Sequence, residues 1–225
     1  MVKTELVMNR EFNINLTIAK FAIVFWDFDG VIKDSLDVKT KAFESLFLSF
    51  GEDVASKVSE HHKSNGGVSR FEKLPLYLSW ADEPATPEQV ADYCDIFAKS
   101  VKQSVIDAPW VPGVREYLLQ NYSKQYFVLV TATPQEEVEE ILSALGIKEC
   151  FREIFGSPIT KKDAISIVLR RQKFDPSQAL MIGDAETDMT AAEANSVSFL
   201  LRRTPQNIHL QEKSYNLKFD DLTYE

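Results

Sequence analysis

Two aspartates, Asp27 and Asp29, directly follow a run of apolar, β-forming residues, FAIVFW, at positions 21–26. A continuous apolar run is typical of a strand that is buried on both faces of a parallel sheet. Ligands of such sheets bind beyond the carboxyl ends of the strands, so both carboxylates are predicted to lie in a binding crevice. A calcium loop is excluded, because Gly30 follows the second aspartate at once, whereas an EF-hand has its glycine at the sixth loop position.

A second strand end carries a similar group of acids. The segment ALMIGDAETDMTAAEA brings an apolar run to Gly183, Asp184 and Asp188 and continues into an Ala-rich helical pattern. The frequency of Asp in turns and helix caps explains one acidic turn, but two of them at the ends of separate core strands are harder to explain in this way. Carboxylates in one crevice repel each other unless a cation lies among them, and these oxygen ligands suit Mg²⁺. We therefore expect Mg²⁺ as a cofactor.

A hydroxyl and two ammonium groups complete the set of candidate site residues. The strand-like segment FVLVTATP ends with Thr131 at the same predicted edge, and FGSPITKKDAI places Lys161 and Lys162 at the start of a helical pattern. The first turn of a helix is an unfavourable place for a cation, which indicates another purpose for a lysine there. Taken alone, however, Thr131 also suits a core or cap position, and the two lysines suit a solvated surface.

The elements that position these residues alternate along the chain. Apolar runs at 21–26, 126–130 and 179–182 predict strands, and helical patterns lie between them. This alternation predicts an α/β fold, a doubly wound parallel sheet covered by helices on both faces. We also expect residues 12–18 to add an edge strand.

Residues 36–109 interrupt this alternation with helical patterns alone. Positions 38–50 place five apolar residues on one helical face, and Gly51 is a suitable C-terminal stop; the five are Ala42, Phe43, Leu46, Phe47 and Phe50. Pro109 and Pro112 stiffen the return of the chain. The sequence thus predicts an all-helical insertion between two crossings that act as a hinge, and we call residues 36–109 the helical insertion.

Composition narrows the classes of partner. The net charge of −9 and the pI near 5.0 argue against binding of nucleic acid, which uses clustered Lys and Arg. The sequence has no stretch of about 18 apolar residues that would predict a membrane span, and its N-terminus lacks the uninterrupted apolar region of a secretion signal. We therefore expect a cytoplasmic protein.

Cys94 and Cys150 are far apart, which predicts reduced core residues and neither a disulfide framework nor a thiolate metal site. We expect a monomer or a weak dimer.

Together these residues resemble the four motifs of the haloacid dehalogenase superfamily of phosphohydrolases, in the family's order. The motifs are Asp27-Phe28-Asp29-Gly30-Val31 with Asp34-Ser35, Thr131 after a strand, a downstream lysine, and Gly183-Asp184 with Asp188. The resemblance extends over residues 21–203 and implies a Rossmann-like core made of residues 1–35 and 110–225. The helical insertion is similar to the family's C1-type cap, as in the β-phosphoglucomutase and phosphoglycolate phosphatase branch.

The resemblance also implies a mechanism. Asp27 attacks phosphorus to form an aspartyl-phosphate, and Asp29 protonates the leaving oxygen and then activates water. Mg²⁺ is held by Asp27, by the backbone carbonyl of Asp29 and by Asp184, with support from Asp188. Thr131, the following Ala132 and a lysine bind the phosphoryl oxygens. The spacing G-S-P-x-x-K favours Lys161 over Lys162 as that lysine. The family often has Asn or Gly where this chain has Ala132, so this loop departs from the family's pattern at that position.

The function implied is a Mg²⁺-dependent phosphomonoester hydrolase that acts on a small phosphorylated metabolite. A sugar phosphomutase is the alternative, because NGGVSRFEKL in the helical insertion resembles the mutase loop in which Ser69 and Arg70 bind the distal phosphate. A non-enzymatic module that binds a phosphate ligand is a third possibility, since fold does not fix function. Asp29 argues against dehalogenases and phosphonoacetaldehyde hydrolases, which lack this second acid, and the Lys-Thr-Gly-Thr motif of transport ATPases is missing.

Overall fold

The fold is centred on one parallel sheet, in a computed structural model that describes residues 14–213 and 217–223. The strand order is β3-β2-β1-β4-β5-β6, and every neighbouring pair is parallel. The strands are β1 (Ile23–Trp26), β2 (Tyr126–Pro134), β3 (Glu153–Ser157), β4 (Ala179–Gly183), β5 (Ser198–Arg202) and β6 (Leu217–Phe219). The three apolar runs of the sequence are thus the three central strands, and the predicted α/β parallel sheet is confirmed.

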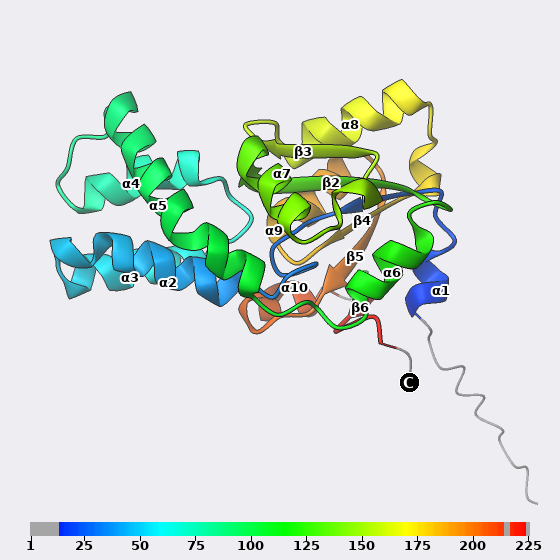
Figure 1. Cartoon of the computed structure of the whole chain (residues 1–225), viewed down its shortest axis with the longest axis horizontal. Coiled ribbons are helices and arrows are strands. Elements are labelled where there is room, and N and C mark those ends of the chain that lie inside the picture. The colour runs from blue at the N-terminus through cyan, green and yellow to red at the C-terminus, as the bar shows by residue number, and fades with distance from the viewer. Residues whose placement is uncertain (1–13, 214–216, 224–225) are drawn as a thin grey trace, which may run out of the picture.

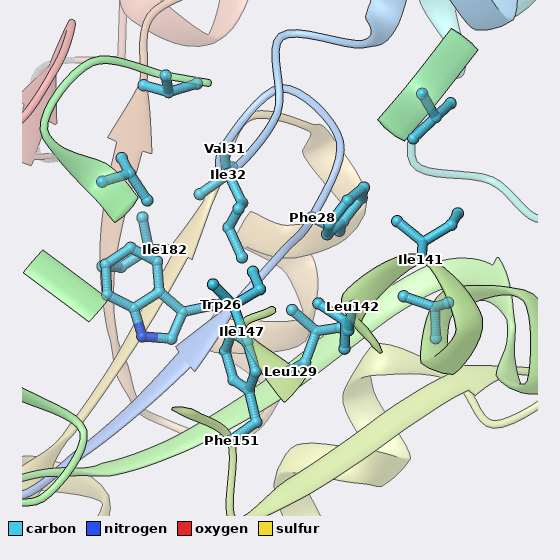
Figure 2. Packing of buried hydrophobic residues seen from close by; sticks show 14 of the residues in the cluster. Trp26, Phe28, Val31, Ile32, Leu129, Ile141, Leu142, Ile147, Phe151 and Ile182 are labelled. Carbon is cyan, nitrogen blue, oxygen red and sulfur yellow. The ribbon is translucent and has the colours of Figure 1, made fainter. Parts of the chain in front are cut away.

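Alternating side chains of the central strands pack into two separate hydrophobic clusters. Val24 and Trp26 face one cluster, whereas Ile23 and Phe25 face the other. The first cluster is covered by α6 (Val114–Asn121) and α7 (Gln135–Ala144), and Figure 2 shows part of its packing around Trp26. The second is covered by α8 (Lys161–Gln172) and α9 (Glu186–Ala194). Both faces of the sheet are therefore buried, which explains the continuous apolar runs in these strands.

The prediction of an edge strand at residues 12–18 is wrong. Its described part is a short helix, α1 (Ile14–Ile18), and residues 12 and 13 lie outside the described residues. The two buried side chains of α1, Asn15 and Ile18, are three positions apart, as on one face of a helix. Asn15 Nδ2 donates to the backbone oxygen of Leu222 at 3.0 Å. This contact with the far end of the chain helps to fix the helix, and a local alternation of apolar residues could not reveal it.

The helical insertion consists of four α-helices that lie beside the sheet (Figure 1). They are α2 (Leu36–Phe47), α3 (Glu52–Ser64), α4 (Arg70–Trp80) and α5 (Pro87–Asp107), and a 3₁₀ turn, η1 (Leu48–Phe50), follows α2. Gly51 ends that turn with a φ of 109°, which favours glycine. The five apolar residues predicted for the inner face of α2 and η1 all join the first hydrophobic cluster, with Phe43 and Phe47 fully buried.

The two crossings into and out of the helical insertion lie side by side. The backbone nitrogen of Asp34 donates to the oxygen of Pro109 at 2.8 Å, and that of Val111 donates to the oxygen of Ile32 at 3.0 Å. The Nζ atom of Lys33 also donates to the oxygen of Ile106. Chain segments about 75 residues apart thus form one narrow connection. A division at residues 35 and 110 into a core and a mobile cap stays a prediction.

The remaining short elements connect this framework. They are the 3₁₀ turns η2 (Lys148–Cys150), η3 (Pro176–Gln178) and η4 (Pro205–Asn207) and the helix α10 (Ile208–Gln211). Cys94 and Cys150 are both buried, as predicted for core residues. Among the described residues, no helix is both long enough and apolar enough to cross a membrane.

Candidate active site

Three neighbouring strands bring the predicted site residues to one edge of the sheet. Asp27 follows β1, Asp184 follows β4, and Thr131 lies near the end of β2, with β1 between the other two strands. The hydrogen bonds between β1 and β4 extend to the first of these residues: the backbone nitrogen of Asp27 donates to the oxygen of Ile182 at 2.9 Å. Parallel strands end at a common edge, so residues more than 150 positions apart in sequence become neighbours.

A compact acidic cluster occupies this edge. Carboxylate oxygens of Asp27, Asp184 and Asp188 all lie within 4.8 Å of one another, and the three side chains are buried. The ammonium of Lys161 lies between two of them, with Nζ at 2.7 Å from Asp27 Oδ2 and 2.5 Å from Asp188 Oδ1. We call Asp27, Asp184 and Asp188 the acidic cluster. Of the two candidate lysines, Lys161 is the one whose Nζ contacts it.

The positive charge of Lys161 alone does not compensate the negative charges of the acidic cluster. Burial raises the pKa of Asp27 to about 7, with a further contribution from the charge of Asp188 and an opposing one from Lys161. Burial and the charges of Asp27 and Asp188 raise the pKa of Asp184 well above its usual range. The pKa of Lys161 is raised, since the two carboxylates outweigh the effect of its burial. Three convergent oxygen ligands with unfavourable ionisation fit a divalent cation such as Mg²⁺.

The side chain of Asp29 is bound away from the acidic cluster. Its carboxylate accepts from the ammonium of Lys39, from the hydroxyl of Ser35 at 2.6 Å and from the hydroxyl of Thr133 at 3.2 Å. Burial raises the pKa of Asp29, but the charge of Lys39 and these hydrogen bonds outweigh it, so the pKa lies below its usual range. The predicted metal ligand at this position was the backbone carbonyl, and that contact stays a prediction.

Lys39 and Thr133 are site residues that the sequence reasoning missed. Besides its pair with Asp29, Lys39 Nζ donates to Thr133 Oγ1 at 2.9 Å, which links the start of the helical insertion to β2. A signal for Lys39 was available in the sequence, because it lies four residues before Phe43 and eight before Phe47, on the buried face of α2. A lysine on such a face requires a buried partner.

A cavity of about 400 Å³ lies between the helical insertion and the core at this edge. Thr131, Ala132 and Lys161 line it together with Asp184, and Ser69 lines it from the helical insertion. The hydroxyl of Ser69 is 2.9 Å from that of Ser157, another lining residue. Four predicted phosphate-binding or substrate-binding residues therefore share one space with a member of the acidic cluster.

Arg70 lies elsewhere than predicted. It is missing from the described residues that line the cavity, and its guanidinium makes two hydrogen bonds of 2.8 Å to the carboxylate of Glu137 on α7. The resemblance to a phosphate-binding loop identified Arg70 by its position in a motif. It did not reveal the carboxylate on another helix that occupies the guanidinium.

His62 is a cavity residue of the helical insertion that the sequence did not single out for substrate contact. Its Nδ1 atom lies 2.9 Å from Nζ of Lys73, which also donates to the oxygen of Asn65 at 2.8 Å. The adjacent His61 contacts the hydroxyl of Tyr77 instead, so the two histidines point to different partners. Burial lowers the pKa of Lys73 to about 7, with a further contribution from the charge of Lys39.

Lys73→Met is expected to flatten the dependence of folding stability on pH. Because the pKa of Lys73 falls from an ordinary 10.5 to about 7 on folding, the unfolded chain binds more protons between these values. The free energy of unfolding therefore rises with pH across this window, by about 2 kcal/mol from pH 7 to pH 9, and the variant lacks this gain. Urea unfolding of the wild type and of Lys73→Met at pH 7 and pH 9 measures this gain in the free energy of unfolding. Equal gains in both proteins would show that Lys73 titrates normally in the folded state.

Comparisons with known proteins agree with this geometry. Residues 24–201 match the family model described as "Haloacid dehalogenase-like hydrolase". A protein of Pseudomonas putida named phosphoglycolate phosphatase is 29% identical over 186 residues, which cover 78% of this chain and 66% of that relative, just under two thirds of its length.

Two solved structures illustrate the similarity of fold. The β-phosphoglucomutase of Clostridium difficile has a TM-score of 0.71 at 21% identity and covers 90% of this chain and 92% of its own. A predicted phosphoglycolate phosphatase from Haemophilus somnus has a TM-score of 0.70 at 19% identity, with 90% and 95% covered. At these identities the structural likeness concerns the fold alone.

Proposed function

The chain belongs to the haloacid dehalogenase-like hydrolase family, and on this premise we propose that it is a phosphomonoester hydrolase for a small phosphorylated metabolite. One observation carries the proposal: the buried carboxylate of Asp27 lies against Lys161 and within 4.8 Å of Asp184 and Asp188, and Lys161 and Asp184 line the cavity. A nucleophile, a fixed cation and ligands for a second cation are the parts that phosphoryl transfer needs.

Asp27 is the proposed nucleophile. Its carboxylate forms a bond to phosphorus while the bond from phosphorus to the ester oxygen breaks, and water then cleaves the aspartyl-phosphate. Lys161 holds the carboxylate in place and offers a positive charge to the phosphoryl oxygens, which the Thr131 hydroxyl also contacts. Asp27, Asp184 and Asp188 would hold Mg²⁺, which neutralises the negative charge of the phosphate when bound.

Asp29 is the proposed acid and base. Its low pKa keeps it ionised in the resting arrangement, which suits removal of a proton from the attacking water. For the first step, Asp29 carries a proton to the leaving oxygen, and this requires that Lys39 and Thr133 loosen their hold on the carboxylate. Ser35, Lys39 and Thr133 thus position the acid and set its protonation.

The substrate proposed for the first assay is phosphoglycolate, after the printed name of the Pseudomonas putida relative. The cavity of about 400 Å³ is within the range of pockets that hold larger ligands, so sugar phosphates of five or six carbons are proposed as well. Polar groups of the helical insertion, including His62 and Ser69, also line the cavity and are proposed to contact hydroxyl or carboxylate groups of the substrate.

The purified protein with Mg²⁺ is expected to release inorganic phosphate from at least one member of a panel of phosphoglycolate, sugar phosphates and nucleoside monophosphates. Phosphate release and formation of isomers are measured in the same samples, and kcat/KM ranks the substrates. Folded protein that releases no phosphate from any member would contradict the proposed function.

A sugar phosphomutase is the second candidate, and the Ser69-Arg70 loop favours it. A mutase needs a second anion site, and it must keep water from the aspartyl-phosphate while the intermediate reorients in the cavity. The pairing of Arg70 with Glu137 speaks against this candidate, because a guanidinium already bound to a carboxylate is not free for a second phosphate. Isomerisation faster than phosphate release in the same panel would favour the mutase.

A further inference from the structure

A buried ion pair joins the helical insertion to the core. Arg70, at the start of α4, binds Glu137, in the first turn of α7, through two parallel hydrogen bonds of 2.8 Å. Only 5% of the arginine side chain and 8% of the glutamate side chain are exposed. The guanidinium also lies 4.6 Å from the ring centre of Phe97 on α5. Both charges are therefore withdrawn from water and matched by a bidentate geometry.

The stability of the folded protein is lowered strongly when one partner of such a buried pair is removed. Two desolvated charges that face each other compensate for the loss of their hydration, whereas one of them alone leaves an uncompensated buried charge. A substrate anion that displaced Glu137 from Arg70 would leave the glutamate in this unfavourable state. The guanidinium is thus occupied by the chain's own carboxylate.

The segment next to Arg70 contacts the core at two further places around the cavity. The hydroxyl of Ser69 is 2.9 Å from that of Ser157, and the hydroxyl of Thr187 donates to the oxygen of Gly67 at 3.4 Å. A Cβ atom on Gly67 would lie 2.9 Å from Cβ of Ala185, closer than real contacts allow. The loop of residues 66–70 is therefore seated tightly on the core, and the Arg70–Glu137 pair is its buried, charged contact.

We propose that Glu137 is a positioning residue, which holds the helical insertion closed over the active site by binding Arg70. The pair seats residues 66–70 so that Gly67 and Ser69 form one wall of the cavity, and it keeps Arg70 from serving as a ligand for a substrate anion. The catalytic consequence rests on the proposed phosphomonoesterase function. The closure itself does not depend on that function.

A double-mutant cycle distinguishes this role from a substrate contact of Arg70. Arg70→Ala and Glu137→Ala are each expected to lower kcat/KM by about 10-fold to 100-fold, because either change opens the same contact. The double variant is expected to be no worse than either single one, and the exchanged pair Arg70→Glu with Glu137→Arg is expected to recover part of the loss. A loss in Arg70→Ala together with unchanged or improved kcat/KM in Glu137→Ala would overturn the proposal and make Arg70 a substrate ligand.

The chain offers a matched control for this cycle. Lys102 on α5 and Glu140 on α7 also link the helical insertion to the core, at 2.6 Å, but their side chains are 43% and 62% exposed. Exposed ion pairs contribute little, so Lys102→Ala is expected to change kcat/KM by less than about 2-fold. An effect of Lys102→Ala as large as that of Glu137→Ala would overturn the special role of the buried pair.

Amide hydrogen exchange tests the closure without any substrate. Glu137→Ala and Arg70→Ala are expected to speed exchange at residues 66–70 by about 10-fold or more, while strands β1 and β4 keep the protection of the wild type. Glu137→Gln keeps the side-chain shape and serves if the alanine variant does not fold; it is expected to show a smaller increase. Unchanged exchange at residues 66–70 in folded variants would overturn the proposal. A wild-type protein that releases no phosphate would instead refute the proposed function and leave this readout valid.

Discussion

Asp27→Asn is expected to lower kcat for phosphate release by about 10⁴-fold or more, because an amide cannot form the acyl-phosphate bond that the carboxylate forms. The substitution preserves the shape of the side chain and removes one of the mutually repelling buried charges, so the fold is expected to remain intact. Release of phosphate from the best substrate of the panel, measured with circular dichroism on the same samples, provides the test. Asp92→Asn, on the exposed side of α5, is the control and is expected to retain full activity.

Trapping with beryllium fluoride gives a second readout for the same residue. Beryllium fluoride with Mg²⁺ binds an aspartate as a mimic of its phosphorylated form, so it is expected to raise the Tm of the wild type and leave that of Asp27→Asn unchanged. Phosphate release by Asp27→Asn at a rate near that of the wild type would refute the assignment of the nucleophile. An equal shift of Tm in both proteins would show that the trapped group binds elsewhere.

Removal of divalent cations is expected to lower phosphate release by about 10³-fold or more, since several kcal/mol of charge stabilisation is lost from the transition state. Dialysis against a chelator, followed by return of Mg²⁺, is expected to abolish and then restore the activity. Asp184→Asn is expected to weaken the response to Mg²⁺, because it replaces one of the three carboxylates of the acidic cluster with a neutral amide. Full activity in the presence of excess chelator would contradict the metal site.

Stability provides a test of the metal site that is independent of turnover. The pKa values of Asp27 and Asp184 are raised on folding, so the folded chain holds more protons above the ordinary pKa of 3.8. In the absence of metal, this contribution to stability falls as pH rises from about 4 to about 7, the folded pKa of Asp27. Mg²⁺ relieves the repulsion, so its effect on Tm is expected to be larger at pH 8 than at pH 5. An equal shift at both pH values would contradict this electrostatic account.

The central part of the fold was predictable from local patterns. β1, β4 and the first part of β2, residues 126–130, are apolar because both faces of the sheet are covered, and their runs are visible in the sequence without any knowledge of distant residues. The position of the aspartates that follow β1 and β4 was also predictable, because residues after the carboxyl ends of parallel strands lie at the same edge of the sheet.

The edges of the sheet were not predictable in this way. β3 has three half-buried residues among its five, and β6 is only three residues long, so neither carries the continuous apolar run that marked the central strands. Residues 14–18 have a pattern that also fits a strand, and the bond from Asn15 to Leu222 helps to make them a helix. At the periphery, packing with distant segments outweighs the local preference.

The sequence by itself determined which residues gather at the edge of the sheet: the carboxylates after β1 and β4, Thr131 on β2 and a lysine at the start of α8. The tertiary structure alone decided how their charges are compensated. Lys161 reaches Asp27 across 134 positions, Thr133 reaches Asp29 across 104, and Glu137 occupies Arg70 across 67. Each of these partners is set by the distance and burial that folding creates, because a charge pairs with whatever opposite charge is left beside it when water is removed.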